Sequence, residues 1–441
     1  MQVPASVGQR LLAMIAHYRR GHGALSCPVL CQIRGPLRVD ALQQALDGLT
    51  AAHESLRTTM TGRGTSIAQV VHDPATVELR VVDAAQGASV FAEDAAGAKA
   101  AANDAAGAYV DTAVAAELTD PVEVTAWPLR ATLWRTGPLE HTLCLNIHHL
   151  FTDAWSTGIL FTDLLARYAQ ARGEPVTPAM PQWQYRDFVA WQEELSAGNG
   201  LDRHREYWRQ RLAALQLPNL PYQEPGPADE FGVHRAEIPP HVADGLRQVA
   251  KTCQTTLFTL MLALYYAVLR RTCGQDDLAV ASLFANRSRP EAGRTVGFLA
   301  NMVVLRTEVS GRASFAEAVR ATHATVAGAL AHQEHPYQTL PLEAAALGHG
   351  RADDVVFQMM AEFDHRAVSA GVEFELLVPD GIGARFGTEL ALAPRGRGIT
   401  AVLFTTPRLS PQTAKSMLAA YLSSAAAVAG NPTVALKHLG R

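Results

Sequence analysis

Segments with helical periodicity and segments with strand periodicity follow one another along the whole chain. Helical spacing of apolar residues predicts helices over residues 37–49, 91–118, 156–168, 185–208, 256–269, 315–332 and 413–428. Alternating or continuous apolar runs predict strands over residues 141–149, 278–283, 302–308 and 399–405. Helices and strands mixed in both halves of the chain predict an α/β or α+β fold.

Two breaks rich in proline interrupt this pattern, at residues 173–181 and 218–227. We place a domain boundary at the first break, and a length of 441 residues suits two domains. The predicted domains are residues 1–175 and residues 176–441, and the second includes a connector segment rich in aromatic residues. Within the first domain, Asp40 and Ser156 are predicted to cap the helices that follow them.

Composition narrows the class of protein. Hydrophobic residues make up 48% of the chain and charged residues 18%, which excludes wholesale disorder. The net charge of −4 argues against a nucleic-acid partner. No signal peptide is visible, and the apolar stretch over residues 255–269 is too short to span a bilayer. We therefore expect a cytoplasmic protein with no membrane partner.

Cysteines and histidines give no sign of a metal site. Five cysteines, an odd and sparse number, suit a reducing compartment, and no second pair follows Cys27 and Cys31 to complete a zinc site. The spacing of His332, His335 and His365 fits no metal-ligand pattern, so we interpret them as surface residues.

Chemistry concentrates at the end of the strand predicted over residues 141–149. His148 and His149 are adjacent and therefore face opposite sides of this strand, so one ring can face a cavity while the other packs within the scaffold. Histidine is the natural candidate for a base near neutral pH. Asp153 follows four residues later and could either orient a histidine or form a salt bridge that fixes the loop.

Further short motifs occur in order along the chain. They are Ser6–Leu11, Ala52–Thr58, HHLFTDA at residues 148–154, Tyr185–Gln192, Thr256–Phe258, Gly274–Asp277, Asn286–Pro290, Gly297–Asn301, His332–Tyr337 and Val356–Gln358. Together they resemble the motifs of nonribosomal peptide synthetase condensation domains, which belong to the chloramphenicol-acetyltransferase-like superfamily. The signature of that family is H-H-x-x-x-D-G, and each other motif is weak by itself.

The resemblance implies two acetyltransferase-like lobes in a V-shaped pseudo-dimer with a central tunnel. It implies an acyltransferase that joins a carrier-bound acyl or aminoacyl thioester to an amine, forming an amide in nonribosomal peptide (antibiotic) biosynthesis. The partners would be acyl or peptidyl carrier proteins, whose 4'-phosphopantetheine arms carry the substrates. A thioester is already activated, so no permanently bound cofactor or metal is expected.

The resemblance also assigns roles to residues. His149 corresponds to the catalytic histidine, which acts as general base or positions the acceptor and stabilises the intermediate. Asp153 is expected to form a structural salt bridge with Arg287, reaching from the second lobe. The supporting motif around His149 is His148, Asp153, Ala154 and Trp155.

Two departures from the family pattern leave alternatives open. Ala154 stands where the family has glycine, so either the backbone there is ordinary or the loop is shifted. Ala52 stands where the second motif usually has arginine.

Two other functions therefore remain: a free-standing acyltransferase acting on a soluble amine or alcohol, or a catalytically silent domain that binds carriers and recruits other enzymes. No carrier attachment site or adenylation loop is visible in these 441 residues. If complete as written, the chain would act in trans; if cut from a synthetase, those modules would lie beyond its ends.

Overall fold

Contacts between residues divide the chain into two compact units, each assembled from segments far apart in the sequence. The first unit comprises Met1–Gly198, Arg287–Ala300 and Phe363–Ile382, and the second comprises Asn199–Asn286, Asn301–Glu362 and Gly383–Arg441. The computed structural model describes residues 1–18, 25–84, 99–224, 226, 231–310, 314–340, 342, 350–360, 365–377, 386–431 and 433–439.

The boundary predicted near residue 176 lies inside the first unit. The first unit continues to Gly198 because the helix that begins at Tyr185 packs against Ala292 and Leu299 of the Arg287–Ala300 segment. Prolines at the break mark a loop between two helices and not the point where contacts divide. The V-shaped arrangement and the tunnel stay predictions.

A six-stranded sheet forms the centre of the first unit, with strand order β12-β13-β2-β7-β6-β5. Its strands are β12 (Arg366–Ser369), β13 (Val372–Leu377), β2 (Val29–Arg34), β7 (Glu140–Ile147), β6 (Leu129–Arg135) and β5 (Leu79–Asp83). Neighbouring strands are antiparallel except for the parallel pair β5 and β6. A second sheet joins β1 (Gln2–Pro4), β4 (Ala68–Val71) and β3 (Thr58–Thr61).

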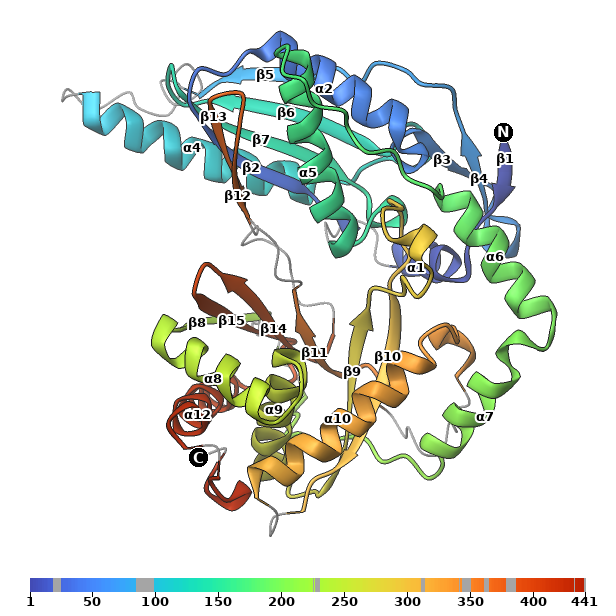
Figure 1. Cartoon of the computed structure of the whole chain (residues 1–441), viewed down its shortest axis with the longest axis vertical. Helices are drawn as coiled ribbons and strands as arrows, with labels where there is room; N and C mark the ends of the chain where they lie inside the picture. The colour runs from blue at the N-terminus through green and yellow to red at the C-terminus, as the bar shows by residue number, and fades with distance from the viewer. Residues whose placement is uncertain are drawn as a thin grey trace. The chain divides into compact units, whose positions relative to one another are not determined.

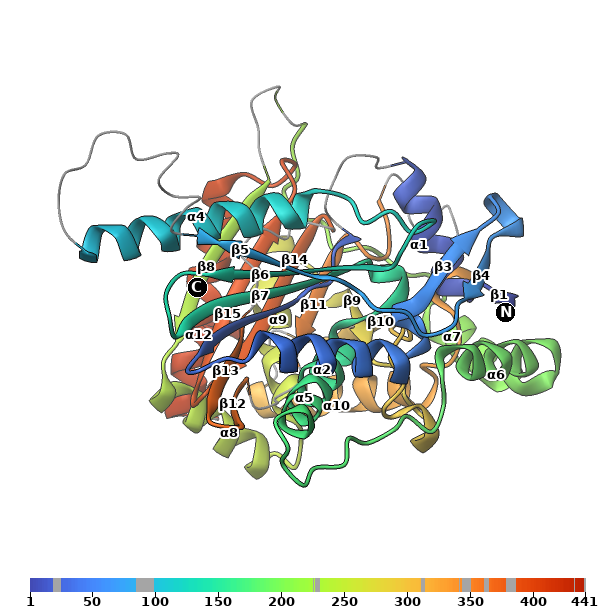
Figure 2. The ribbon, with the colours of Figure 1, turned by 90° about the horizontal axis from the view of Figure 1, so that it is seen from above.

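Helices cover both faces of this six-stranded sheet (Figures 1 and 2). The helices of the first unit are α1 (Val7–Tyr18), α2 (Val39–Ala52), α4 (Lys99–Thr119), α5 (Ala154–Ala171) and α6 (Tyr185–Ala197). Leu143, Leu145 and Ile147 of β7 pack with α2 and α5, whereas Cys144 packs with α4 on the other face. The predicted alternation along β7 is therefore confirmed as far as Ile147, where the strand ends before the two histidines.

The predicted cap of α2 is wrong. The helix begins at Val39, and Asp40 lies inside its first turn. The residue at the N-cap position is Arg38, and the carboxylate of Asp40 pairs with it, with 2.9 Å between Oδ1 and Nε. An acidic side chain there still interacts favourably with the positive end of the helix dipole.

The second unit holds another six-stranded sheet, with strand order β10-β9-β11-β14-β15-β8. Its strands are β10 (Asn301–Glu308), β9 (Asp277–Phe284), β11 (Val355–Met359), β14 (Thr388–Arg395), β15 (Gly398–Thr405) and β8 (Gly232–Ile238). Its helices are α7 (Asp202–Arg211), α8 (Pro240–Thr252), α9 (Leu257–Cys273), α10 (Phe315–Ala331) and α12 (Pro411–Gly430).

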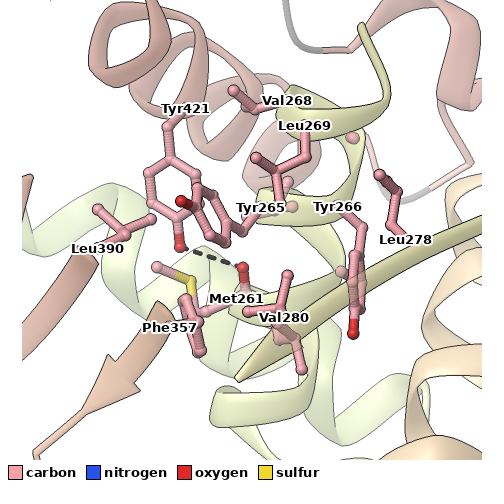
Figure 3. Packing of buried hydrophobic residues seen from close by; sticks show 14 of the residues in the cluster. Met261, Tyr265, Tyr266, Val268, Leu269, Leu278, Val280, Phe357, Leu390 and Tyr421 are labelled. Atoms are coloured by element: carbon pink, nitrogen blue, oxygen red, sulfur yellow. Dashed lines mark hydrogen bonds between the residues drawn. The ribbon is translucent and has the colours of Figure 1, made fainter. Parts of the chain in front are cut away.

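Helix α9 forms the centre of the core of the second unit. Tyr265 stacks against Phe357 of β11, and the Tyr421 hydroxyl of α12 donates to the carbonyl oxygen of Met261, 3.1 Å away (Figure 3). The helix starts after Thr256, whose hydroxyl accepts from the backbone N–H of Thr259. The strongly apolar pattern predicted over residues 256–269 is therefore a core helix.

Among the described residues, no single helix is long and apolar enough to cross a membrane. The pair α8 and α9 satisfies the length and composition criteria only when taken together, and the two helices meet at 104°.

Candidate active site

A tight turn after β7 carries the two histidines. The strand ends at Ile147, residues His149–Phe151 form one turn of 3₁₀ helix, and α5 starts at Ala154. The N–H of His148 donates to the carbonyl oxygen of Pro128 across 3.1 Å. This bond ties the start of the turn to the residue that precedes β6. Both side chains are thereby placed on backbone that is fixed at each end.

His149 is buried, and one of its ring nitrogens has a defined partner. Nδ1 lies 2.7 Å from the carbonyl oxygen of Thr152. A carbonyl oxygen only accepts hydrogen bonds, so in the neutral ring Nδ1 carries the proton and Nε2 is the basic nitrogen. The ring of Phe298 meets the imidazole edge to face, with 5.2 Å between ring centroids and 85° between planes.

His148 has the opposite arrangement. Its Nδ1 accepts a hydrogen bond from the backbone N–H of Leu150 at 3.1 Å and caps the 3₁₀ turn, so the basic nitrogen is already used. Burial, together with the neighbouring His149, lowers the pKa of His148 from its usual 6.5 to about 3. His148 therefore stays neutral and supports the turn.

This low pKa predicts how stability depends on pH. The unfolded chain binds a proton at His148 below about pH 6.5, whereas the folded chain does not until about pH 3. The contribution of His148 to the free energy of unfolding is therefore complete above about pH 6.5. It falls by about 1.4 kcal/mol per pH unit as the pH drops toward 3. Urea unfolding of His148→Asn, which keeps an acceptor but cannot titrate, should show a weaker acid dependence than wild type; equal slopes would contradict the assignment.

Asp153 and Arg287 form a buried salt bridge with two hydrogen bonds. Arg287 Nη1 lies 3.0 Å from Oδ2 of Asp153, and Nη2 lies 3.0 Å from Oδ1. The two side chains are only 2% and 3% exposed. The expected pair forms, but both residues belong to the first compact unit, so the expectation that Arg287 reaches from the second lobe was wrong.

Four further hydrogen bonds reach the Asp153 carboxylate. Oδ1 accepts from the N–H and the hydroxyl of Ser156, and Oδ2 accepts from the N–H groups of Leu299 and Ala300, at 2.7–3.1 Å. Burial alone would raise the pKa of Asp153, but the charge of Arg287 and these hydrogen bonds lower it overall. Asp153 is therefore a charged structural anchor, without capacity left for proton transfer.

Asp153, and not Ser156, caps helix α5. The Asp153 side chain accepts from the N–H of Ser156, which is the third residue of the helix. The prediction that Ser156 is the cap was wrong because the helix starts two residues before it. The Ser156 hydroxyl instead lies against Asp153, Arg287 and Gly297.

The alanine at position 154 leaves the turn undisturbed. Ala154 is the first residue of α5, is exposed, and does not have a positive φ. Of the two alternatives raised by the missing family glycine, the structure shows ordinary helical backbone. Trp155 follows with a 44% exposed side chain, and its Nε1 donates to the carbonyl oxygen of Gly293 at 3.2 Å.

Two contacts in the site had no role assigned from sequence. The backbone of Leu299 and Ala300 binds Asp153, and the buried Gln9 donates from Nε2 to the carbonyl oxygen of Leu150 at 3.0 Å. Gln9 also completes a capping box with Ser6 at the start of α1. Both lie in motifs that carried the family resemblance, which was the signal available.

Gly297 is expected to be intolerant of a side chain. A Cβ there would lie 2.1 Å from Cδ2 of Tyr185, a buried ring whose hydroxyl lies 2.8 Å from the Ser6 hydroxyl. Gly297→Ala should therefore lower the free energy of unfolding by about 1–3 kcal/mol, the usual cost of overpacking. Gly107→Ala in helix α4, where a Cβ meets nothing within 4 Å, is the matched control and should not destabilise. Equal losses in the two variants would contradict the prediction.

The histidine of the second motif is buried and lies in a separate ion cluster. His53 Nε2 is 2.8 Å from Oδ2 of Asp163, and Arg167 and Arg294 approach the same carboxylate at 3.5 and 3.3 Å. Burial lowers the pKa of His53 although Asp163 opposes the shift. Two arginines therefore balance the negative charge of Asp163, even though Ala52 replaces the arginine of the family motif.

The three histidines interpreted as surface residues are not exposed. His335 is 2% exposed, and His332 stacks on Tyr207 with 4.1 Å between ring centroids. His332 and His365 are partly buried. The interpretation as a surface residue was wrong for His335, which is buried with Nε2 3.2 Å from the carbonyl oxygen of Thr339, and holds only in part for His332 and His365. Within the described part of the chain, no three His, Cys, Asp or Glu residues form a group that could hold a metal ion.

Known proteins are similar to this chain in sequence. A linear gramicidin synthase of Brevibacillus parabrevis is 30% identical over 451 residues, covering 99% of this chain and 9% of that protein. The chain spans about an eighth or less of the length of several such curated relatives.

Solved structures agree on the fold. The first condensation domain of the calcium-dependent antibiotic synthetase, in complex with a substrate analogue, superposes with a TM-score of 0.83 at 19% identity, covering 100% of this chain and 98% of that one. The X-domain from teicoplanin biosynthesis superposes with a TM-score of 0.79 at 22% sequence identity, covering 99% of this chain and 97% of that one.

The family itself follows from the sequence match. The family model described as Condensation domain matches residues 2–375, a range that includes the histidine turn, the salt bridge and the Gly297–Asn301 segment. The chain therefore belongs to the condensation domain family of nonribosomal peptide synthetases.

Proposed function

We propose that this chain transfers an acyl or aminoacyl group from a carrier-bound thioester to an amine acceptor and so forms an amide bond. The observation that carries the proposal is the hydrogen bond from His149 Nδ1 to the carbonyl oxygen of Thr152. It makes Nε2 the basic nitrogen of a buried ring, as a general base requires.

The chemistry needs only one proton acceptor. The amine nitrogen attacks the thioester carbon, a tetrahedral intermediate forms, and the C–S bond breaks to release the carrier thiol. Nε2 of His149 takes the proton that the amine loses and then returns it to the departing sulfur. A base contributes about 10²- to 10⁴-fold, and holding the two reactants together contributes the rest.

The remaining residues of the motif keep His149 in place. Asp153 caps α5 and binds Arg287, which fixes the backbone immediately after Thr152. The Thr152 carbonyl oxygen is the acceptor for Nδ1, so this anchor determines where the imidazole stands. Asp153 and Arg287 act as positioning residues, and His148 supports the turn.

The partners in this proposal are carrier proteins whose 4'-phosphopantetheine arms present donor and acceptor. Such arms reach the site as substrates, so the chain needs no resident cofactor. Membership of the condensation domain family supports this proposal. The acceptor could instead be a soluble amine or alcohol, which gives the test its second arm.

Intact-mass spectrometry on two carrier proteins tests the proposal. One carrier is loaded with an acyl group and the other with an amino acid, and both are incubated with the wild-type chain, with His149→Ala or alone. We expect the acyl mass to move to the acceptor carrier only with wild type.

Each other outcome contradicts the proposal in a distinct way. Unloading of the donor only when a small amine or alcohol is supplied would establish a soluble acceptor. No transfer, although the loaded carrier binds in a pull-down, would establish a recruitment domain without catalysis.

A further inference from the structure

The backbone around Phe298 is held by hydrogen bonds on both sides. Gly297 donates its N–H to the Ser156 hydroxyl at 3.2 Å, and Leu299 donates to Asp153 at 3.1 Å. The Phe298 carbonyl oxygen itself lies 2.8 Å from the Tyr185 hydroxyl. This segment is therefore fixed to the same anchor that supports the histidine turn, and its aromatic side chain, Phe298, contacts His149.

Helix α1 also approaches the Phe298 ring, at Gly8. A Cβ at Gly8 would lie 2.8 Å from Cε1 and 3.0 Å from Cδ1 of Phe298, closer than side chains approach one another. The Gly8 backbone cannot yield easily, because Ser6 and Gln9 on either side are buried and tied together by a capping box. Glycine at position 8 thus leaves the space that the Phe298 ring needs.

The hydrogen bond to Thr152 does not by itself fix the plane of the His149 ring. The bond from Nδ1 to the Thr152 oxygen sets one direction, but the imidazole can still rotate about that direction. The edge-to-face contact with Phe298, at 5.2 Å and 85°, supplies a second constraint. Together the two contacts determine where Nε2 points.

We propose that Phe298, which packs against Gly8, is a positioning residue that sets the ring plane of His149. This inference rests on the proposed function, because orientation of Nε2 matters only if His149 acts on the acceptor. It connects the Ser6–Leu11 motif, the histidine motif and the Gly297–Asn301 motif in one line of contacts: α1 supports Phe298, and Phe298 supports His149.

The test compares Phe298→Leu and Gly8→Ala with wild type. The full chain is labelled with ¹⁵N-histidine, and the His149 ring signals are assigned from their absence in His149→Ala. Ring nitrogen shifts report the tautomer, and shifts of the carbon-bound ring protons report the aromatic ring beside it. Gly107→Ala, where a Cβ meets nothing within 4 Å, is the matched control. Melting temperatures establish that each variant is folded.

We expect the His149 ring proton signals to move in both variants and to stay unchanged in Gly107→Ala. The kcat of transfer should fall roughly 10- to 100-fold, because a misplaced catalytic group lowers the rate by about that factor. The KM for either carrier should change little. The double variant Gly8→Ala with Phe298→Leu should be no slower than Phe298→Leu alone, because both changes act through one ring.

Unchanged His149 signals in folded Phe298→Leu would overturn the inference, as would additive losses in the double variant. If Gly8→Ala does not fold, the Phe298→Leu comparison decides alone. Failure of the proposed function is distinguishable, since wild type would then transfer nothing, while the His149 ring signals of Gly8→Ala, which keeps the Phe298 ring, still report whether Phe298 orients His149.

Discussion

Replacement of Asp153 by alanine should lower the free energy of unfolding by about 3–5 kcal/mol, the cost of leaving a buried charge without its partner. Arg287 would remain 3% exposed with its counter-ion removed. The N–H groups of Leu299, Ala300 and Ser156 would lose their acceptor at the same time. A loss of this size is a large part of the total stability of a typical domain. Urea unfolding followed by circular dichroism measures it.

Three comparison variants separate the buried charge from the hydrogen bonds. Asp153→Asn keeps acceptor capacity but removes the charge, so its loss should be smaller than that of Asp153→Ala. Asp153→Ala combined with Arg287→Met removes both charges and should recover part of the loss. Asp202→Ala breaks an exposed ion pair with Arg205, in which both side chains are 59% exposed, and should cost less than about 1 kcal/mol. Asp153→Ala and Asp202→Ala with equal midpoints would contradict the prediction.

Elements with a strong local pattern could be predicted from the sequence. The alternation along β7 assigned Leu143 and Cys144 to opposite faces, and the structure places them in different hydrophobic clusters. The apolar run of α9 was recognised because a core helix is apolar on every side. Membership of the condensation domain family is also confirmed, on many weak motifs in the right order.

Other elements carried weaker signals. Strand β8 lies at a sheet edge with alternate residues exposed, and its polar residues, such as His234 and Arg235, disguise the strand. Helix α8 was also missed, although Pro240 at its first position is a recognised start signal. The two predicted helix caps lie two and three residues after the observed N-cap residues. The exact start of a helix depends on backbone geometry that the sequence does not display.

The candidate site was predictable in its residue types and, through the family resemblance, in the pair of Asp153 with Arg287, but not in its other connections. Adjacent histidines on a strand implied different roles, and the structure gives their Nδ1 atoms opposite ones, one paired with a carbonyl oxygen and one accepting an N–H. Nothing local to Asp153 indicates that its carboxylate binds the backbone of residues 299 and 300, about 146 positions away. The contact between Phe298 and Gly8 is likewise a product of tertiary packing.

Replacement of His149 should have the largest effect on transfer. We expect His149→Ala to reduce kcat by about 10²- to 10⁴-fold, the usual contribution of a general base, with a melting temperature close to that of wild type. The ring donates from Nδ1 to a backbone carbonyl oxygen, that of Thr152, so its loss costs far less stability than loss of Asp153. His241→Ala, an exposed histidine in α8, is the matched control and should transfer at the wild-type rate.

His149→Gln distinguishes the two roles left open for this residue. Glutamine can still form hydrogen bonds with an acceptor or an intermediate, but it cannot take up a proton at neutral pH. If His149 is the base, His149→Gln should be as slow as His149→Ala in single-turnover assays with pre-loaded carriers. A rate for His149→Gln within about tenfold of wild type would show that positioning and stabilisation suffice. The tautomer set by Thr152 favours the first result, because it leaves Nε2 as the basic nitrogen.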